Sequence, residues 1–287
     1  MSTDLPFTGE RYVPRITGNI FLEHMHRYIF AAQIVEGKDV LDIASGEGFG
    51  SNLLAKVARS VIGVDISQDV VDHANKKYST PSLGFQAGSA TSIPLPDAAV
   101  DVVVSFETVE HLTGHEKMLS EVKRVLRPGG VLVMSTPDKA IYSDAPGYVN
   151  PFHVRELYRD QFKALLSSQF AHIRMHGQKV SFGSLIVAEE STGPFAETDW
   201  LTLQTISGLA NPLYLIGIAS DDPKAAVTMH GLFSQDMQAS EPVLMRVEYE
   251  LKQAHARFDQ EESLPGSKQT APQDEAKLKL DIGTHIG

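Results

Sequence analysis

The central part of the chain alternates short apolar runs with amphipathic segments. Runs such as Val102-Val103-Val104 have no polar positions between the apolar ones, as in strands that are buried on both faces. The sequence Arg127-Pro128-Gly129-Gly130 ends a helical segment and leads directly into another apolar run. An alternation of strands and helices predicts an α/β fold, a parallel sheet with helices on both faces. The expected strands are 38–43, 61–65, 83–87, 100–105 and 131–135, and the expected helices are 49–58, 68–78 and 116–126.

The segments on either side of this centre are less regular. Residues 21–35 have apolar positions at helical spacing, and 172–188 and 213–220 predict closing strands around a loop-rich insert. Over 242–258 apolar residues recur at spacings of three and four, which predicts a helix that either forms a homodimer or packs back on the domain. The composition beyond 260 is typical of a flexible tail. The expected organisation is an arm and helix over 1–35, a main domain over 36–220, an extension over 221–260 and a tail over 261–287.

Composition narrows the class of protein. The chain has 287 residues, of which 42% are hydrophobic and 21% charged, and it contains no cysteine. These values indicate a soluble globular protein and exclude a disulfide scaffold or a cysteine-based zinc site. The first 20 residues lack the apolar core of a secretory signal, and no apolar run approaches the roughly 18 residues of a membrane span, so we expect a cytoplasmic protein. The net charge of −11 disfavours broad binding to nucleic acid.

A glycine-rich turn follows the first expected strand, in the sequence VLDIASGEGFG over 40–50. Glycines at this point let the chain turn sharply into a helix and let its backbone approach a ligand. Their spacing is Gly-x-Gly-x-Gly, which differs from that of dinucleotide-binding proteins, and Asp42 would repel a pyrophosphate but attract an ammonium group. Asp65, at the end of the next strand, is placed to accept a hydrogen bond from a ribose diol. The alternative interpretation is a turn that needs glycine for its shape alone.

Over 36–188 the chain resembles the class I S-adenosylmethionine-dependent methyltransferases. The similarity lies in the glycine loop, Asp65, the turn over 88–97, the fourth strand and the Leu-Arg-Pro-Gly-Gly turn at 126–130. It implies a Rossmann-like, seven-stranded, mostly parallel sheet with an antiparallel last strand. Ala44 and Ala90 depart from the pattern, since many members have glycine and an acid at these places. The cofactor-binding residues that the resemblance implies are Tyr12, Asp42, Ala44, Gly46, Gly48, Asp65, Ile66, Ser89, Ala90 and Phe106.

The segment after the fourth strand carries candidate catalytic residues. A helix beginning near Glu107 would place Glu107, Glu110 and His111 on one face, at the edge of the sheet where ligands of α/β proteins bind. His153 follows the fifth strand, and we expect it at the start of a helix on the same edge. Two carboxylates and imidazoles that converge in this way suggest a divalent metal site.

This pattern resembles two metal-dependent subgroups, the ubiquinone-biosynthesis O-methyltransferases and the enzymes that methylate the terminal ribose of small RNAs. The resemblance implies that Glu107, Glu110, His111 and His153 bind Mn²⁺ or Mg²⁺. One alternative is a metal-free site in which His111 is the general base and a glutamate orients it. The other is a purely structural role. With a metal on His111, the base would have to be another histidine, for which the sequence offers His24, His26 and His115.

The remaining motifs concern the acceptor. The segments 8–14, 23–28, 105–112 and 150–158 resemble bacterial methyltransferases of surface-polysaccharide and glycan assembly, which are often found beside glycosyltransferases. This resemblance implies a sugar hydroxyl of a glycan as acceptor and glycosyltransferases as partners. It also suggests a lid over the cofactor, formed by Arg11, Tyr12, His26 and Arg27. The alternatives are a quinol, phenol or nucleotide-sugar acceptor, a terminal RNA ribose, or a non-catalytic scaffold that binds the cofactor.

Overall fold

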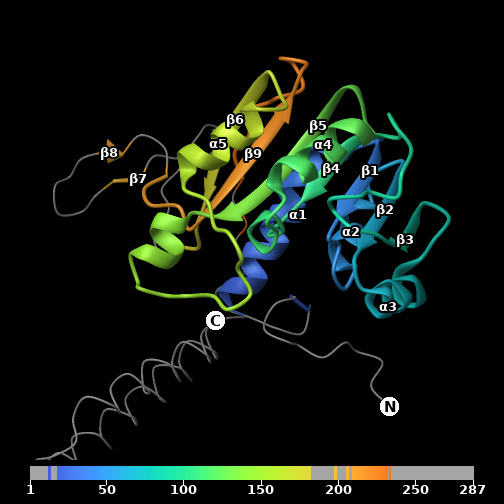
Figure 1. Cartoon of the computed structure of the whole chain (residues 1–287), viewed down its shortest axis with the longest axis horizontal. Coiled ribbons are helices and arrows are strands. Elements are labelled where there is room, and N and C mark those ends of the chain that lie inside the picture. The colour runs from blue at the N-terminus through green and yellow to red at the C-terminus, as the bar shows by residue number, and fades with distance from the viewer. Residues whose placement is uncertain are drawn as a thin grey trace, which may run out of the picture.

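A single seven-stranded sheet forms the centre of the protein (Figure 1). The computed structural model describes residues 12–13, 18–181, 197–198, 205–206, 209–231 and 233. The strand order is β3-β2-β1-β4-β5-β9-β6; the first five strands run parallel, and β9 is antiparallel to both β5 and β6. The predicted mostly parallel sheet with an antiparallel last strand is therefore confirmed. Its strands are β1 (Asp39–Ile43), β2 (Ser60–Asp65), β3 (Leu83–Ala87), β4 (Val100–Ser105), β5 (Leu126–Pro137), β6 (His172–Gln178) and β9 (Tyr214–Ser220).

Helices cover both faces of the sheet, as predicted. The face that carries α1, α2 and α3 and the face that carries α4 and α5 each have a continuous apolar core. A short separate hairpin pairs β7 with β8 in the segment expected to be loop-rich. The remaining elements are α1 (Asn19–Val35), α2 (Phe49–Leu54), α3 (Gln68–Tyr78), α4 (His115–Val125), α5 (Arg159–Ser167), β7 (Glu197–Thr198) and β8 (Thr205–Ile206).

The uninterrupted apolar strands divide their side chains between the two cores. In β4, Val102 and Val104 belong to the core under α1, α2 and α3, whereas Val103 belongs to the core under α4 and α5. All three are fully buried. Since successive side chains of a strand point to opposite faces, both faces need apolar residues, and the sequence shows no alternation.

The structure corrects one prediction about the segment after β4. No helix begins at Glu107: the backbone there has a φ of 50°, and only a 3₁₀ turn over Val109–His111 follows. The amide of Glu107 donates to Oγ of Ser135, 3.2 Å away, which holds the residue in this left-handed conformation. The two glutamates and the histidine therefore do not share one face of a helix.

The predicted position of His153 at the start of a helix is also wrong. The nearest helix, α5, begins at Arg159, and His153 lies in the preceding loop. The amides of Val154 and Arg155 donate to the carbonyl of Glu110, at 2.8 and 3.0 Å, so the loop is bonded to the 3₁₀ turn that follows β4 and not to a helical turn of its own.

Some predicted elements have different limits in the structure, and others lie outside the described residues. The helix expected over 49–58 ends at Leu54, and the strand expected over 172–188 ends at Gln178. Most of the arm, the helix expected over 242–258 and the tail over 261–287 lie outside the described residues and stay predictions. Among the described residues, no helix is long and apolar enough to cross a membrane.

Helix α1 supports the glycine loop through Tyr28, and this contact can be tested with one substitution. A Cβ on Gly50 would lie 2.0 Å from Cζ of Tyr28, whose ring packs edge-on against Phe49 and Phe106. We expect Gly50→Ala to lower the free energy of unfolding by about 2 kcal/mol, because the ring cannot move away. Chemical denaturation measures the change. Gly84→Ala is the matched control, since a Cβ there meets no atom within 4 Å; equal effects of the two variants would contradict the prediction.

Candidate functional site

The candidate residues from the sequence gather at one edge of the sheet. Strands β1, β2, β4 and β5 run parallel, so their carboxyl ends meet there. The glycine loop follows β1, Asp65 ends β2, and the segment with Glu110 and His111 follows β4. This is the edge at which open α/β sheets bind their ligands.

The glycine loop turns through three left-handed residues. Ala44, Gly46 and Gly48 have φ values of 60°, 56° and 96°. A Cβ on Gly48 would lie 2.9 Å from the ring of Phe85, so both the conformation and the space require glycine there. Ala44 adopts the left-handed conformation in spite of its Cβ, at a cost of about 1 kcal/mol.

The carboxylate of Asp42 lies fully buried beneath this loop. Its Oδ2 accepts a 2.6 Å hydrogen bond from Oγ of Ser51, and the hydroxyl of Tyr28 lies 3.3 Å from both oxygens. Burial raises the pKa of Asp42 to about 7; the two hydroxyl groups lower it and the charge of Asp65 raises it by smaller amounts. Near neutral pH this carboxyl group is therefore poised between its two protonation states.

Asp65 is held by backbone amides. Its two oxygens accept hydrogen bonds from the amides of Gly46 and Ser67, both at 3.0 Å. The next side chain, Ile66, is 79% exposed beside this carboxylate and would offer an apolar surface to a ligand. The turn after β3 begins at the same edge, where the amide of Gly88 donates to the carbonyl of Asp65.

The other predicted cofactor residues take different positions around this edge. Tyr12 is buried, stacks on His24 with 4.7 Å between ring centroids, and meets Phe49 edge-on. Burial and the charge of Glu47 raise the pKa of Tyr12 to about 12. Phe106 is buried against Tyr28. Ser89 bonds to Thr91 within its own turn, while Ala90 packs against the core. Contacts of these residues with a cofactor stay predictions.

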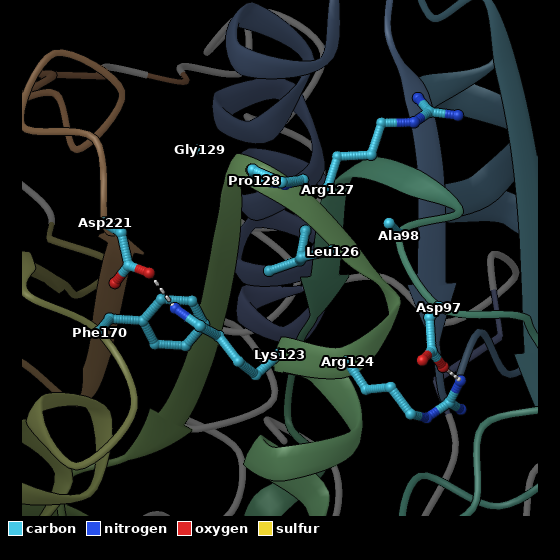
Figure 2. A pocket seen from close by; sticks show the side chains of 11 residues that line it. Asp97, Ala98, Lys123, Arg124, Leu126, Arg127, Pro128, Gly129, Phe170 and Asp221 are labelled. Carbon is cyan, nitrogen blue, oxygen red and sulfur yellow. Dashed lines mark hydrogen bonds and ion pairs between the residues drawn. The ribbon is translucent and has the colours of Figure 1, made fainter.

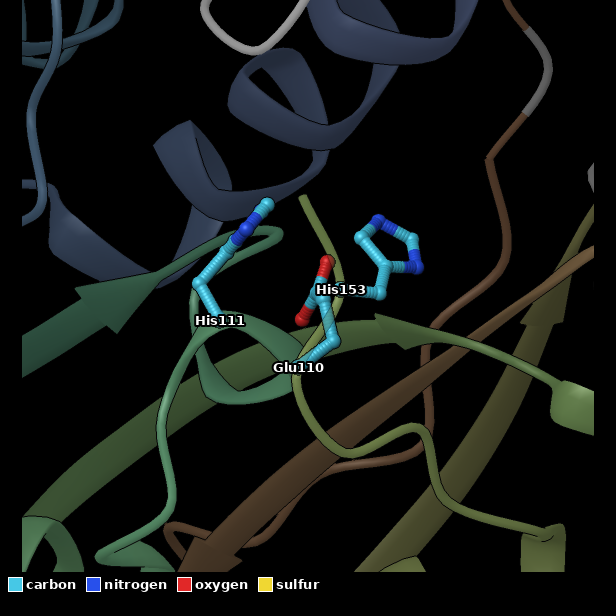
Figure 3. A group of neighbouring side chains, drawn as sticks. All are labelled: Glu110, His111 and His153. Atoms are coloured by element: carbon cyan, nitrogen blue, oxygen red, sulfur yellow. The ribbon is translucent and has the colours of Figure 1, made fainter. Parts of the chain in front are cut away.

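A second centre lies where β4 and β5 end (Figure 3). One carboxylate oxygen of Glu110 and one ring nitrogen each of His111 and His153 lie within 4.8 Å of one another. Glu110 is fully buried; its Oε2 accepts a 3.3 Å hydrogen bond from Thr136, and its Oε1 has no partner among the described residues. Burial, and next the negative charge of Glu107, raise the pKa of Glu110 well above its usual range.

Hydrogen bonds fix the orientation of both imidazoles. Nδ1 of His111 lies 2.9 Å from the carbonyl of Phe152, which can only accept, so Nδ1 carries the proton. Nδ1 of His153 lies 2.5 Å from a carboxylate oxygen of Glu156, and its Nε2 lies 3.1 Å from the amide nitrogen of Asn150. An imidazole with its proton on Nδ1 has its lone pair on Nε2, the arrangement that metal-binding and basic histidines share. The Nε2 lone pair of His153 accepts from the amide of Asn150 in this structure.

Glu107 lies apart from this cluster of Glu110, His111 and His153. Its Oε1 accepts a 2.5 Å hydrogen bond from Ser135 and lies 3.9 Å from Nη1 of Arg27. Arg27, expected in the lid, is buried instead: its Nη1 donates to Gln178 at 2.8 Å, and its guanidinium lies 4.7 Å from the ring centroid of Tyr214. Glu107 is thus placed as a neighbouring charge and not as part of the three-residue cluster.

The three alternative bases occupy separate places. His24 stacks on Tyr12, and burial holds its pKa well below the usual range. His26 lies near Phe233, and His115 is fully buried at the start of α4. His24 and His115 are thus held by packing within the fold.

Several residues around the site were not singled out from the sequence. Ser135 and Thr136 follow Met134, which pairs with Ser105 in the parallel register, so strand pairing places their hydroxyl groups beside the glutamates. Glu156 stands three residues after His153, a short spacing that indicates a local contact. Glu47, in the glycine loop, and its three partners were also missed: its carboxylate lies 2.7 Å from Nζ of Lys77, 3.0 Å from the hydroxyl of Tyr78 and 3.3 Å from Nε2 of His73.

A hollow of about 350 Å³ lies at the opposite edge of the sheet, at the start of β5 (Figure 2). Its charged side chains are all paired: Lys123 with Asp221, Arg124 with Asp97, and Arg127 with Asp39 and Asp101. It is remote from the carboxyl ends of the parallel strands, and we assign it no part in the chemistry of the site.

Comparisons with known proteins find methyltransferases similar to this chain. Residues 41–134 match a family model described as a methyltransferase domain. A Mycolicibacterium smegmatis protein named "Probable S-adenosylmethionine-dependent methyltransferase" is 41% identical over 169 residues, which are 57% of this chain and 64% of that protein. A fatty-acid O-methyltransferase of the same species is 29% identical over 170 residues, 58% of this chain and 59% of that protein. The YcgJ protein from Bacillus subtilis shares the fold, with a TM-score of 0.51 and 20% identity over 68% of this chain and 97% of its own.

The raised pKa of Asp42 leads to a prediction about the pH dependence of cofactor binding. The resemblance places the ammonium group of S-adenosylmethionine near this carboxylate, and an ammonium group binds best to the ionised form. Because the pKa of Asp42 is about 7, we expect the affinity for S-adenosylmethionine to fall as the pH is lowered through about 7. Calorimetric titration measures the affinity. Asp42→Asn should weaken binding at high pH and remove the dependence; a wild-type affinity that does not change with pH would contradict the assignment.

The stability of the protein without cofactor should fall as the pH rises, whereas its affinity for S-adenosylmethionine should increase. The folded pKa of Asp42 lies above the unfolded value of about 4, so the folded state binds this proton more tightly. The contribution of Asp42 to stability is therefore lost as the pH rises from about 4 to about 7. In Asp42→Asn the free energy of unfolding should therefore decrease less with pH over this range. Chemical denaturation at several pH values measures this decrease.

Proposed function

We propose that this protein, which carries a class I S-adenosylmethionine-dependent methyltransferase domain, transfers the methyl group of S-adenosylmethionine to a hydroxyl oxygen of its acceptor. The observation that carries the proposal is the position of Glu110. A fully buried carboxylate with an unpartnered oxygen lies between two oriented imidazoles, at the edge of the sheet that carries the glycine loop. Buried polar atoms are almost always satisfied, so an exception of this kind indicates a reacting or ligand-binding group.

The chemistry of the reaction explains why such a group is needed. The sulfonium of S-adenosylmethionine already has a good leaving group, so the difficulty lies in the acceptor. A hydroxyl group is a weak acid and must lose its proton as its oxygen attacks the methyl carbon. His111 can take that proton on Nε2, because its Nδ1 donates to the carbonyl of Phe152.

A divalent metal ion bound at this centre is the preferred version of the proposal, and His111 as a metal-free base is the alternative. The unpartnered Oε1 of Glu110 and the two imidazoles form a mixed oxygen and nitrogen donor set that fits Mn²⁺ better than Mg²⁺. Glu110, His111 and His153 would hold the ion, and Glu107 would contribute its charge from a position against Ser135. A cation there supplies positive charge that lowers the pKa of a nearby hydroxyl group. A metal on His111 and proton transfer to His111 exclude each other, since both need the same lone pair.

For the acceptor we propose a sugar hydroxyl of a glycan, with glycosyltransferases as partners, as the resemblance of the sequence motifs implies. Aromatic side chains around His153 support this choice: Tyr142 stacks on His153 and meets both Tyr148 and Tyr214. A lipid acceptor is the second candidate, favoured by the similarity to a fatty-acid O-methyltransferase. Transfer of radiolabelled methyl groups into the polysaccharide, glycolipid and lipid fractions of an extract of the source organism separates the two.

Replacing Glu110 tests the centre directly. Glu110→Gln keeps the size of the side chain and removes its negative charge. We expect methyl transfer to fall at least about 100-fold, while the affinity for S-adenosylmethionine changes little, because Glu110 lies outside the glycine loop. Glu116→Gln, on the exposed surface of α4, is the matched control and should keep full activity. Full activity of Glu110→Gln would refute the metal interpretation and any part of Glu110 in the chemistry, because His111 is oriented by the carbonyl of Phe152 and not by Glu110.

Removal of metal distinguishes the metal-dependent mechanism from the one in which His111 is a metal-free base. We expect EDTA to abolish methyl transfer into the glycan fraction and Mn²⁺ or Mg²⁺ to restore it. Direct binding provides a readout besides activity: the electron paramagnetic resonance of Mn²⁺ should report binding to the wild-type protein and at least about tenfold weaker binding to His153→Ala. Activity that is indifferent to EDTA, together with no Mn²⁺ binding, would leave His111 as a metal-free base.

A further inference from the structure

The loop that carries His153 presents an unusual number of apolar side chains to solvent. Nine large apolar side chains are exposed among the described residues, and five of them lie within 148–158, which we name the apolar loop. Val149 is 82% exposed and Val154 is 59% exposed. Single exposed apolar residues are common, but a concentration in one short segment marks an interaction surface. The five are Tyr148, Val149, Phe152, Val154 and Tyr158.

Hydrogen bonds hold the apolar loop in this exposed position. The amides of Val154 and Arg155 donate to the carbonyl of Glu110, and the carbonyl of Phe152 accepts from His111. At the end of the loop, Leu157 is buried and its carbonyl accepts from the amide of Lys139 at 3.1 Å. The backbone is therefore anchored while the apolar side chains stay outside, so their exposure follows from the way the loop is bonded.

The apolar loop is continuous with the second centre of the site. The ring of Tyr148 lies 5.8 Å from that of Tyr142, which stacks on His153 at 5.4 Å. Asn150 joins the two, since its amide nitrogen lies 3.1 Å from the hydroxyl of Tyr142 and 3.1 Å from Nε2 of His153. A partner in contact with Tyr148 is thus separated from His153 by the ring of Tyr142 alone. A second copy of the protein in that position would cover the acceptor's approach to the site.

Charge distinguishes the apolar loop from the rest of this acidic protein. The protein carries a net charge of −11, but the exposed charged side chains over 148–160 are Arg155, Arg159 and Asp160, two positive charges and one negative. Arg155 is half exposed, with a 3.9 Å ion pair to the largely exposed Glu116. Glu156, the acid of the apolar loop, is turned inward against His153. Exposed valines, aromatic rings and arginines in one segment are the features of a surface that inserts into the interface of an anionic bilayer.

We propose that the apolar loop docks on an anionic lipid surface and that the acceptor reaches His153 from that surface, as part of a lipid-linked molecule. The statement about the acceptor rests on the proposed function; the statement about docking does not. Insertion of Val149 and Val154 would remove both side chains from water, and Arg155 and Arg159 would meet the anionic headgroups. The acceptor's reacting group would then stand beside the site while its lipid part stays in the bilayer.

Co-sedimentation with vesicles tests the docking without any turnover. The full chain is mixed with vesicles of phosphatidylcholine alone or with one third phosphatidylglycerol. We expect binding to the anionic vesicles, weaker binding to the neutral ones, and at least about tenfold weaker binding for the double variant Val149→Asp, Val154→Asp. Val57→Asp is the matched control, because Val57 is an exposed valine on another part of the surface. Thermal melting checks that the variants are folded, and single Val→Ser substitutions replace any that is not.

Each outcome decides the proposal. Binding that depends on the two valines and not on Val57 supports it. No binding of the wild-type protein to either vesicle, or equal binding of all variants, overturns it. Self-association that the double variant abolishes, without vesicle binding, also overturns it and makes a second copy the occupant. Glu110→Gln should bind vesicles like the wild-type protein, so a failure of the proposed chemistry and a failure of docking are distinguishable.

Discussion

Two fully buried carboxyl groups, Asp42 and Glu110, define the working edge of the sheet. Burial of a carboxylate without a cation is costly, and in both residues the pKa rises for this reason. Hydrogen bonds from the hydroxyl groups of Ser51 and Tyr28 offset part of this cost at Asp42. Oε1 of Glu110, in contrast, has no partner among the described residues. A positively charged group at either place would relieve the burial. The burial of both carboxyl groups is therefore consistent with the cationic groups that the proposal places at this edge.

Helix α1 connects the two halves of this edge. Its apolar face packs on the sheet as part of one of the two cores, while Tyr28 reaches Asp42 and Arg27 lies near Glu107. A helix that was expected to belong to a lid therefore also supports the site from within the core. The same aromatic ring that contacts Asp42 packs against Phe49, at the start of α2, so core packing and the position of the glycine loop depend on one side chain.

Most of the fold could be predicted from the sequence, because its signals are local. The limits of α3, β3 and β4 agree with the predicted segments, and the glycine loop follows β1 as expected. The errors arose where a distant segment decides the local conformation. Glu107 is held in a left-handed turn by Ser135, and the backbone around His153 is bonded to Glu110, more than 40 residues earlier in the chain. Helical spacing around Glu107 carries no information about either contact, so the residues of the cluster were predicted but their arrangement was not.

The insertion of β9 between β5 and β6 has a consequence for how the chain assembles. Strand β6 is synthesised before β9, yet in the described sheet it pairs with β9 and not with β5. As the chain leaves the ribosome, strands β1 to β5 can form a parallel sheet that includes the glycine loop and the segment after β4. One edge of β5 then stays open until Tyr214–Ser220 has been made. An unpaired apolar edge is prone to pair with other chains. Strand β9 therefore determines when the open edge of β5 is covered and the nascent protein is protected from aggregation, although none of the residues of β9 belongs to the candidate cluster.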